Sequence, residues 1–127
     1  MEARELRIGN LFTDKYSKNI IPVLELSRNG NIVFDFECAG VWQAEAIPLT
    51  EQWLFNFGFE KGNYEEWSLY LPDDNLSCKF ELKYNEIYGY RLCQEGCFVF
   101  SEIKYIHQLQ NLYFALTGKE LILKDKN

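Results

Sequence analysis

The first third of the chain alternates apolar and polar positions, which predicts an antiparallel β unit. Gly30 suits the left-handed position of a three-residue turn, so a hairpin is expected around it. That turn pairs Leu26 with Ile32 and Leu24 with Phe34, which leaves one face of the hairpin apolar. We expect a small curled sheet or open barrel with strands at residues 6–12, 21–27 and 31–37.

A short helix is predicted next, over residues 51–57. The hydroxyl of Thr50 can accept a hydrogen bond from a free N–H of the first turn, and Gly58 suits the position after the last turn. The apolar face of this helix is formed by Trp53, Leu54 and Phe57.

Apolar and polar positions then alternate again. This pattern predicts a four-stranded antiparallel meander with strands at residues 64–71, 76–83, 87–93 and 97–101. The turns between them set Trp67 opposite Phe80 and Leu92 opposite Phe98, so one face is apolar. Another layer must cover such a face. Its members are Trp67, Leu69, Phe80, Leu82, Tyr88, Tyr90, Leu92, Phe98 and Phe100.

Apolar residues at three- and four-residue spacing predict a closing helix over about residues 102–116, which we expect to cover the meander. Ser101 can cap its start, and Gly118 suits its end. A last short strand is predicted at residues 121–123. The apolar stripe of the helix consists of Ile103, Ile106, Leu109, Leu112, Tyr113 and Leu116.

The predicted fold class is therefore α+β: an amino-terminal antiparallel β unit, a short helix, and a four-stranded antiparallel meander covered by a carboxy-terminal helix. A length of 127 residues is that of one domain, so a single domain is expected over residues 1–127. Within it, we distinguish a β unit at 1–47 from an α-β-meander-α unit at 48–127.

The charge of the chain disfavours nucleic-acid binding. The formal net charge is −6, whereas a protein held by phosphates needs a positive surface. Residues 1–30 have a net charge of +1 and residues 31–127 a net charge of −7. An acidic surface of this kind suits a basic protein partner, and the simpler interpretation is that it keeps the protein soluble.

The sequence predicts a cytoplasmic protein without a metal or cofactor. The first residues are charged and lack an apolar signal core, and no apolar run is long enough to span a bilayer. The four cysteines form no CxxC pair, and we expect all of them to be free thiols. They are Cys38, Cys78, Cys93 and Cys97.

A first candidate site lies on the predicted closing helix. His107 is the only histidine, and Lys104 and Asn111 lie three positions before and four positions after it, hence on the same helical face. These three side chains could bind a small ligand. The alternative is a polar helix surface that bonds water or nearby loops.

No catalytic pattern accompanies this histidine, so an enzyme is not expected. Glu65 and Glu66 are neighbours in a strand and point to opposite faces, and Asp73 and Asp74 suit a turn. The glycines form no phosphate-binding loop, and no triad pattern surrounds His107.

A second candidate site is aromatic. Trp42, Tyr64 and Tyr70 fall at positions that the predicted strands do not bury, and aromatic residues make up 17 % of the chain. Exposed together, these three would form a patch for a protein partner. The alternative is that they are buried between the two sheets.

Three segments resemble a widespread family of small uncharacterised proteins from gut Bacteroidetes, their prophages and other mobile elements. They are Glu5-Leu6-Arg7-Ile8-Gly9-Asn10, the segment 47–59 that begins IPLTEQWL, and the segment 105–121 with the sequence YIHQLQNLYFALTGKEL. The resemblance covers nearly the whole chain, and the last segment is its most specific part. It implies a bacterial or phage cytoplasmic setting and an accessory role, but no activity.

We therefore predict a non-enzymatic protein that binds another protein, of phage or mobile-element origin. A modulator or inhibitor of a host defence protein would fit this setting and the acidic surface. The alternative is an accessory domain that binds a small molecule or nucleic acid through the face of His107 and Asn111. The sequence predicts no oligomeric state.

Overall fold

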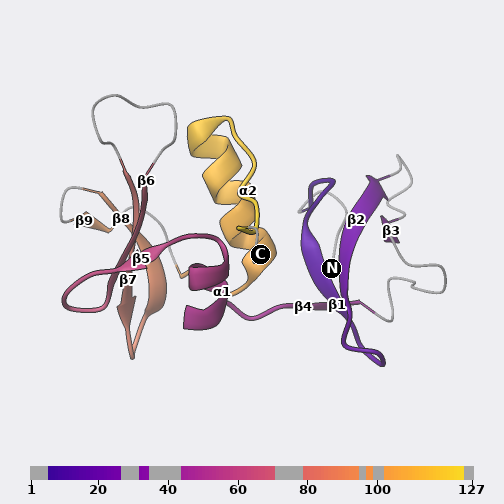
Figure 1. The fold of residues 1–127 in the computed structure, drawn as a ribbon, viewed down its shortest axis with the longest axis horizontal. Coiled ribbons are helices and arrows are strands. Elements are labelled where there is room, and N and C mark those ends of the chain that lie inside the picture. The colour runs from indigo at the N-terminus through magenta and orange to yellow at the C-terminus, as the bar shows by residue number, and fades with distance from the viewer. Residues whose placement is uncertain are drawn as a thin grey trace. The chain divides into compact units, whose positions relative to one another are not determined.

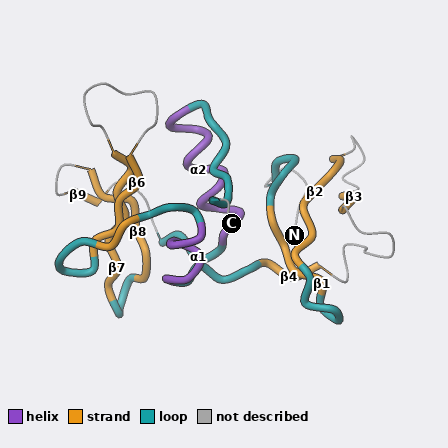
Figure 2. The backbone as a smooth tube through the Cα atoms, in the orientation of Figure 1, coloured by secondary structure: helices purple, strands orange, loops and turns teal. Residues whose placement is uncertain are grey.

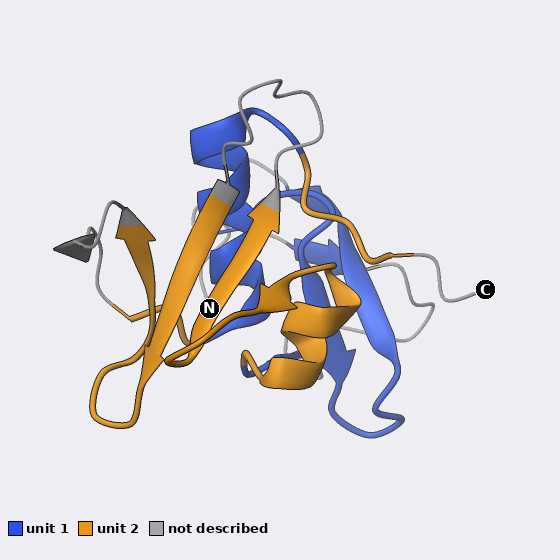
Figure 3. Ribbon diagram, turned by 60° about the vertical axis from the view of Figure 1, so that its left-hand side comes forward, with its two compact units in different colours: residues 1–48, 105–119 blue, residues 49–104, 120–127 orange. Residues whose placement is uncertain are grey.

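A computed structural model describes residues 6–26, 32–34, 44–70, 79–94, 97–98 and 102–124. The chain divides into two compact units, coloured separately in Figure 3. The first unit consists of residues 1–48 and 105–119, and the second of residues 49–104 and 120–127. Both sheets are antiparallel, and the predicted α+β class is confirmed (Figures 1 and 2).

The first unit contains a curled four-stranded sheet with the order β3-β2-β1-β4. The strand predicted at 6–12 starts later than expected, because the chain turns around Gly9, which has a φ of 95°. The N–H of Gly9 donates to the carbonyl of Val23. The strands are β1 (Leu11–Asp14), β2 (Ile20–Leu26), β3 (Ile32–Phe34) and β4 (Ala44–Ala46).

The predicted strand register of the hairpin is correct next to the turn and differs farther from it. Leu26 pairs with Ile32 as expected, but Phe34 pairs with Val23 instead of Leu24, because the register shifts between Val23 and Glu25. A β-bulge of this kind adds one residue to one strand. Here the extra residue keeps Val23 on the same buried face as Leu26, although the two are an odd number of positions apart.

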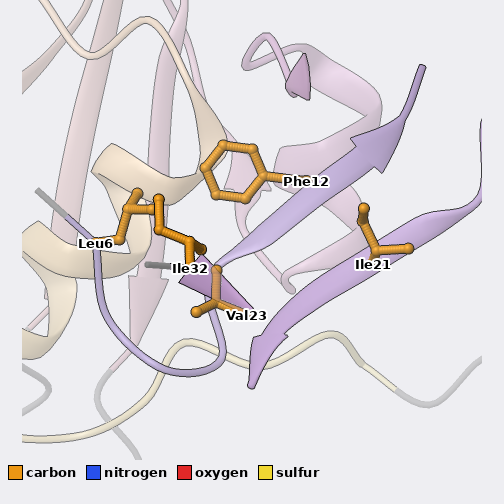
Figure 4. Packing of buried hydrophobic residues seen from close by; sticks show 5 residues of the cluster. All are labelled: Leu6, Phe12, Ile21, Val23 and Ile32. Carbon is orange, nitrogen blue, oxygen red and sulfur yellow. The ribbon is translucent and has the colours of Figure 1, made fainter. Parts of the chain in front are cut away.

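The core of the first unit is formed by side chains from the sheet and the segment before it (Figure 4). Partly buried Leu26, Ala44 and Ala46 pack against this cluster. Its buried members are Leu6, Phe12, Ile21, Val23 and Ile32.

The long helix α2 (Ile106–Thr117) belongs to the first unit, in contact with β1, and not to the unit of the meander as the sequence suggested. It also starts later than predicted, with Tyr105 as N-cap, so Ser101 does not cap it. Ile103 forms a bridge with Tyr90 before the helix begins. Since Ile103 is three positions before Ile106, helical spacing alone could not reveal this start.

The second unit begins with the helix that the sequence predicted. Helix α1 (Glu51–Asn56) starts after Thr50, whose hydroxyl accepts from the N–H of Trp53 at 3.4 Å. Gly58 has a φ of 96°, which suits a glycine after the last turn. Leu54 is fully buried, and the exposed Phe55 meets Trp67 edge to face with ring centroids 4.9 Å apart.

The sheet of the second unit has five strands in the order β5-β6-β7-β8-β9, one more than the predicted meander. Trp67 and Leu82 are its most deeply buried residues. The strands are β5 (Glu60–Lys61), β6 (Glu66–Tyr70), β7 (Lys79–Asn85), β8 (Gly89–Gln94) and β9 (Cys97–Phe98).

Two registers differ from the predicted ones. Trp67 pairs with Leu82 instead of Phe80, a shift of two residues that keeps the same side chains on the buried face. Phe98 pairs with Cys93 instead of Leu92, and Cys97 pairs with Gln94, a register shifted by one residue from the predicted one.

The end of the chain also differs. No strand forms at residues 121–124, although the N–H of Lys124 donates to the carbonyl of Asn56 at 2.8 Å. Within the described ranges, no helix combines the length and the apolar character needed to cross a membrane.

Candidate functional site

His107, the centre of the first candidate site, is buried with 8 % of its surface exposed. Its ring stacks on that of Phe12 at a centroid distance of 5.0 Å and on that of Tyr105 at 5.8 Å. The alternative of a polar helix surface is therefore wrong for His107, whereas its ligand-binding role stays a prediction. The imidazole is part of the packing between α2 and β1.

Asn111 lies in the same junction, where three amide side chains join α2 to the start of β1. Nδ2 of Asn10 donates to Oδ1 of Asn111 at 2.8 Å, and Oδ1 of Asn10 accepts from the N–H of Arg7 at 2.7 Å. The amide of Gln110 accepts from the N–H of Leu11 at 2.9 Å and donates to the carbonyl of Gly9 at 3.2 Å. We call Asn10, Gln110 and Asn111 the amide junction.

Lys104 does not share a helical face with His107 and Asn111, because it precedes the first residue of α2. Helical spacing therefore supports only His107 and Asn111 as neighbours on α2, and the three-residue ligand site stays a prediction. The sequence located polar side chains with the right spacing on α2, but it gave no sign that Asn10 and Gly9 would use them. The amide junction joins residues about 100 positions apart, which local patterns do not report.

The structure describes the side chain of one of the three residues predicted for the second candidate site. Tyr64 is 84 % exposed. Trp42 lies outside the described residues, and so does the side chain of Tyr70, whose backbone ends β6. Of the three predicted aromatic residues, Tyr64 in the second unit is the one shown to be exposed.

Tyr64 occupies a tight turn between β5 and β6 in an unusual conformation. Tyr64 and Glu65 have φ angles of 58° and 60°, and the N–H of Glu66 donates to the carbonyl of Asn63. Positive φ at both central residues defines a type I′ turn, which is dominated by Gly, Asn and Asp. Each ordinary L-residue in this conformation costs about 1–2 kcal/mol. The conformation of Tyr64 and Glu65 in this turn therefore costs stability.

A second turn, between β7 and β8, presents apolar residues at the same end of the sheet. Oδ1 of Asn85 accepts from the N–H of Ile87 at 2.7 Å and from the N–H of Tyr88 at 3.2 Å, and Gly89 has a φ of 71°. These bonds order the tip without burying it, since Ile87 is 81 % exposed and Tyr88 more than half exposed.

The two turns are neighbours because β6 and β7 are antiparallel. Glu66, the first residue of β6, pairs with Lys83 near the end of β7, and the N–H of Tyr84 donates to the carbonyl of Glu65 at 3.0 Å. Figure 2 shows both turns as teal loops of this sheet. We define the tip surface as Tyr64, Tyr84, Ile87 and Tyr88.

Sequence reasoning missed most of the tip surface. It placed Tyr88 on the buried face and assigned no role to Tyr84 or Ile87. A usable signal was present: turns usually contain polar residues, yet the segment between Asn85 and Gly89 contains an isoleucine and a tyrosine.

Three exposed charged side chains form ion pairs near this end of the sheet. Nζ of Lys61 lies 3.1 Å from Oε1 of Glu51 and 3.5 Å from Oε1 of Glu65. The hydrogen bond to Glu51 is the main cause that raises the pKa of Lys61, which keeps it a cation. Burial, with smaller contributions from Glu51 and other neighbours, raises the pKa of Tyr90 to about 12. Lys61 is thus held positively charged and Tyr90 is held neutral, and neither group is an activated base or nucleophile.

Among the residues that the structure describes, no group of three or more His, Cys, Asp or Glu side chains is placed to hold a metal ion. Cys93 is a buried free thiol, while Cys38 and Cys78 and the side chain of Cys97 lie outside the described part.

Comparison of the chain with models of protein families, with curated proteins and with solved structures found no significant match. The resemblance to the family of phage and mobile-element proteins therefore stays a prediction.

Proposed function

We propose that this chain is a non-enzymatic protein that binds another protein through the tip surface. Four large apolar side chains are exposed there, three on two adjacent turns and Tyr84 near the end of β7. Tyrosine combines a large contact area with few rotatable bonds, so it contributes strongly to protein interfaces.

The observation that carries this proposal is the conformation of Tyr64. A glycine or asparagine would suit its φ of 58° better, and its side chain is exposed and does not add to the core. Backbone strain that brings no gain in packing tends to occur at functional sites. A partner that contacts Tyr64 gives a physical reason for a tyrosine at this position.

The resemblance stated above supports a biological role. An accessory protein of phage or mobile-element origin would act in the bacterial cytoplasm as a modulator or inhibitor of a host protein, such as a defence protein. The acidic character of the chain agrees with a basic partner.

The test is affinity capture from a bacterial lysate with the full chain and two matched variants. The first variant, Tyr64→Asn with Ile87→Ser, removes the two most exposed members of the tip surface. The second, Tyr16→Asn with Ile8→Ser, makes the same chemical change at exposed residues of the first unit.

We expect one protein to be recovered in fixed proportion with the unchanged chain and with the Tyr16/Ile8 variant. Its affinity for the Tyr64/Ile87 variant should fall about tenfold or more. Equal recovery by both variants, or no saturable partner at all, would contradict the proposal.

A further inference from the structure

We infer that the tip surface receives an arginine-bearing segment of a basic protein, an inference that rests on the proposed binding role and specifies its partner. Three observations lead to this class of partner: the charge of the second unit, the carboxylates beside the exposed tyrosines, and the way in which this chain already holds its own arginines.

The negative charge of the chain is concentrated in the second unit. Residues 49–104 and 120–127 contain twelve Asp and Glu against seven Lys and Arg, a net charge of −5. The first unit contains seven against six, a net charge of −1. A partner with a positive surface is therefore attracted to the unit that holds the tip surface.

Exposed carboxylates lie directly beside the tip surface. Glu66 follows the Tyr64 turn and Glu86 precedes Ile87, and both are exposed. The carboxylate of Glu102 lies over Gly89, where even a Cβ atom would collide with it.

Two cations of this sheet end, Lys61 and Arg91, are already engaged within the chain. Lys61 lies between Glu51 and Glu65, and the guanidinium of Arg91 lies 4.7 Å from the ring centre of Tyr88. Together with Lys83, which pairs with Glu66, these are three cations, and the nearby carboxylates of Glu51, Glu65, Glu66, Glu86 and Glu102 outnumber them, so an incoming cation is attracted to this end of the sheet.

The chain itself shows how its aromatic rings receive a guanidinium. Arg91 stacks on Tyr88, and in the first unit Arg7 lies 3.7 Å from the ring centre of Phe114. Tyr64 offers a third ring of this kind, and its side chain is largely exposed. Arginine suits such a site better than lysine, because its planar guanidinium is weakly hydrated and can stack on a ring while it bonds a carboxylate.

The first experiment uses the full chain labelled for NMR and three synthetic peptides of equal length. One peptide alternates arginine with leucine, one lysine with leucine and one glutamate with leucine. We expect the arginine peptide to shift the amide signals of residues 62–66 and 84–89, the lysine peptide to do so more weakly, and the glutamate peptide not to shift them. Equal shifts by the glutamate peptide, or arginine-induced shifts that lie mainly in the first unit, would overturn the inference.

The second experiment tests the carboxylates with matched variants. Glu66→Gln with Glu86→Gln removes two charges beside the tip, and Glu25→Gln with Glu45→Gln removes two exposed charges from the first unit. Each tip carboxylate should account for about a two- to fivefold change in the Kd of the arginine peptide. An equal loss for both variants would show that only the total charge matters and would overturn the inference.

The two proposals fail in different ways. If capture of a partner depends on Tyr64 and Ile87 but the arginine peptide produces no shift at the tip, the binding role stands and the basic partner is wrong. If the arginine peptide binds at the tip while no lysate protein depends on these residues, the chemical preference stands and the proposed function is wrong.

Discussion

Each unit of this protein packs one helix against its own sheet, and the two contacts differ in chemistry. In the first unit, α2 meets β1 through the amide junction and the stacked rings of His107 and Phe12. In the second unit, α1 meets the sheet through Phe55 and the buried Trp67.

Because one contact is polar and the other aromatic, different mutations should destabilise them. An amide hydrogen bond contributes little net stability, but its loss leaves a buried donor or acceptor without a partner. An aromatic contact is stabilised by the apolar area it removes from water and by close packing. We therefore expect the second unit to lose most stability when an aromatic side chain is truncated. The first unit should lose most stability when buried hydrogen bonds are removed.

The largest effect is expected for Trp67→Ala, which removes a fully buried aromatic side chain. The free energy of unfolding should fall by about 3–5 kcal/mol, because the change leaves a large cavity next to Phe55. Urea denaturation followed by circular dichroism measures this loss. Ile87→Ala is the control, since its exposed side chain should change stability by less than about 0.5 kcal/mol. A similar cost for both variants would contradict the packing described for the sheet.

An intermediate effect is expected for Gln110→Ala in the amide junction. This change leaves the N–H of Leu11 and the carbonyl of Gly9 without their partner, and should cost about 2–4 kcal/mol. The control is Gln52→Ala, which removes an exposed amide bonded to Asn56 and should cost only about 0.5 kcal/mol. If hydrogen exchange of Leu11 stays as slow as in the unchanged chain, the amide junction does not have the role given to it.

The sequence predicted local elements well because their signals are local. Thr50 and Gly58 marked both ends of α1, and the pairing of Leu26 with Ile32 followed from the turn between them. Alternation also placed Trp67 and Leu82 on one buried face, although it fixes a register only to within an even number of residues.

The errors arose where contacts distant in sequence decide the structure. The apolar stripe of α2 matched the apolar face of the meander, yet the helix belongs to the unit of the amino-terminal sheet, to which polar side chains attach it. His107 was expected on the surface for the same reason: Phe12, its stacking partner, is 95 residues earlier. Tyr64 was correctly selected as unburied, but its positive φ could not be read from its residue type.

A smaller effect, of opposite sign, is expected at the turn that presents Tyr64. Tyr64→Asn and Glu65→Gly each place a residue that tolerates the left-handed conformation at a position with φ near 60°. Each variant should raise the free energy of unfolding by about 1 kcal/mol, because the strain of an L-residue is relieved. Thermal denaturation measures the gain. A loss of stability in both variants would show that the turn is not strained and would remove the main support for the proposed function.

The last predicted effect is a loss of folding stability that is absent at neutral pH and appears only at alkaline pH. Tyr90 in the second unit has a pKa raised to about 12, and burial also raises the pKa of Tyr113 in α2. An unfolded tyrosine releases its proton near pH 10, so between about pH 10 and 12 the unfolded state binds fewer protons than the folded state. Stability must then fall as the pH rises through this range.

Tyr90→Phe should reduce this alkaline loss of stability, and Tyr113→Phe should reduce it separately, because the two side chains belong to different units. Ultraviolet titration of the folded chain should show two tyrosines that ionise at a higher pH than a free tyrosine does. If the Tyr90→Phe variant loses stability with pH as steeply as the unchanged chain, Tyr90 is not held neutral by its surroundings. The end of the sheet beneath the tip surface would then be more open to water than the contact between Tyr84 and Tyr90, with ring centroids 4.7 Å apart, indicates.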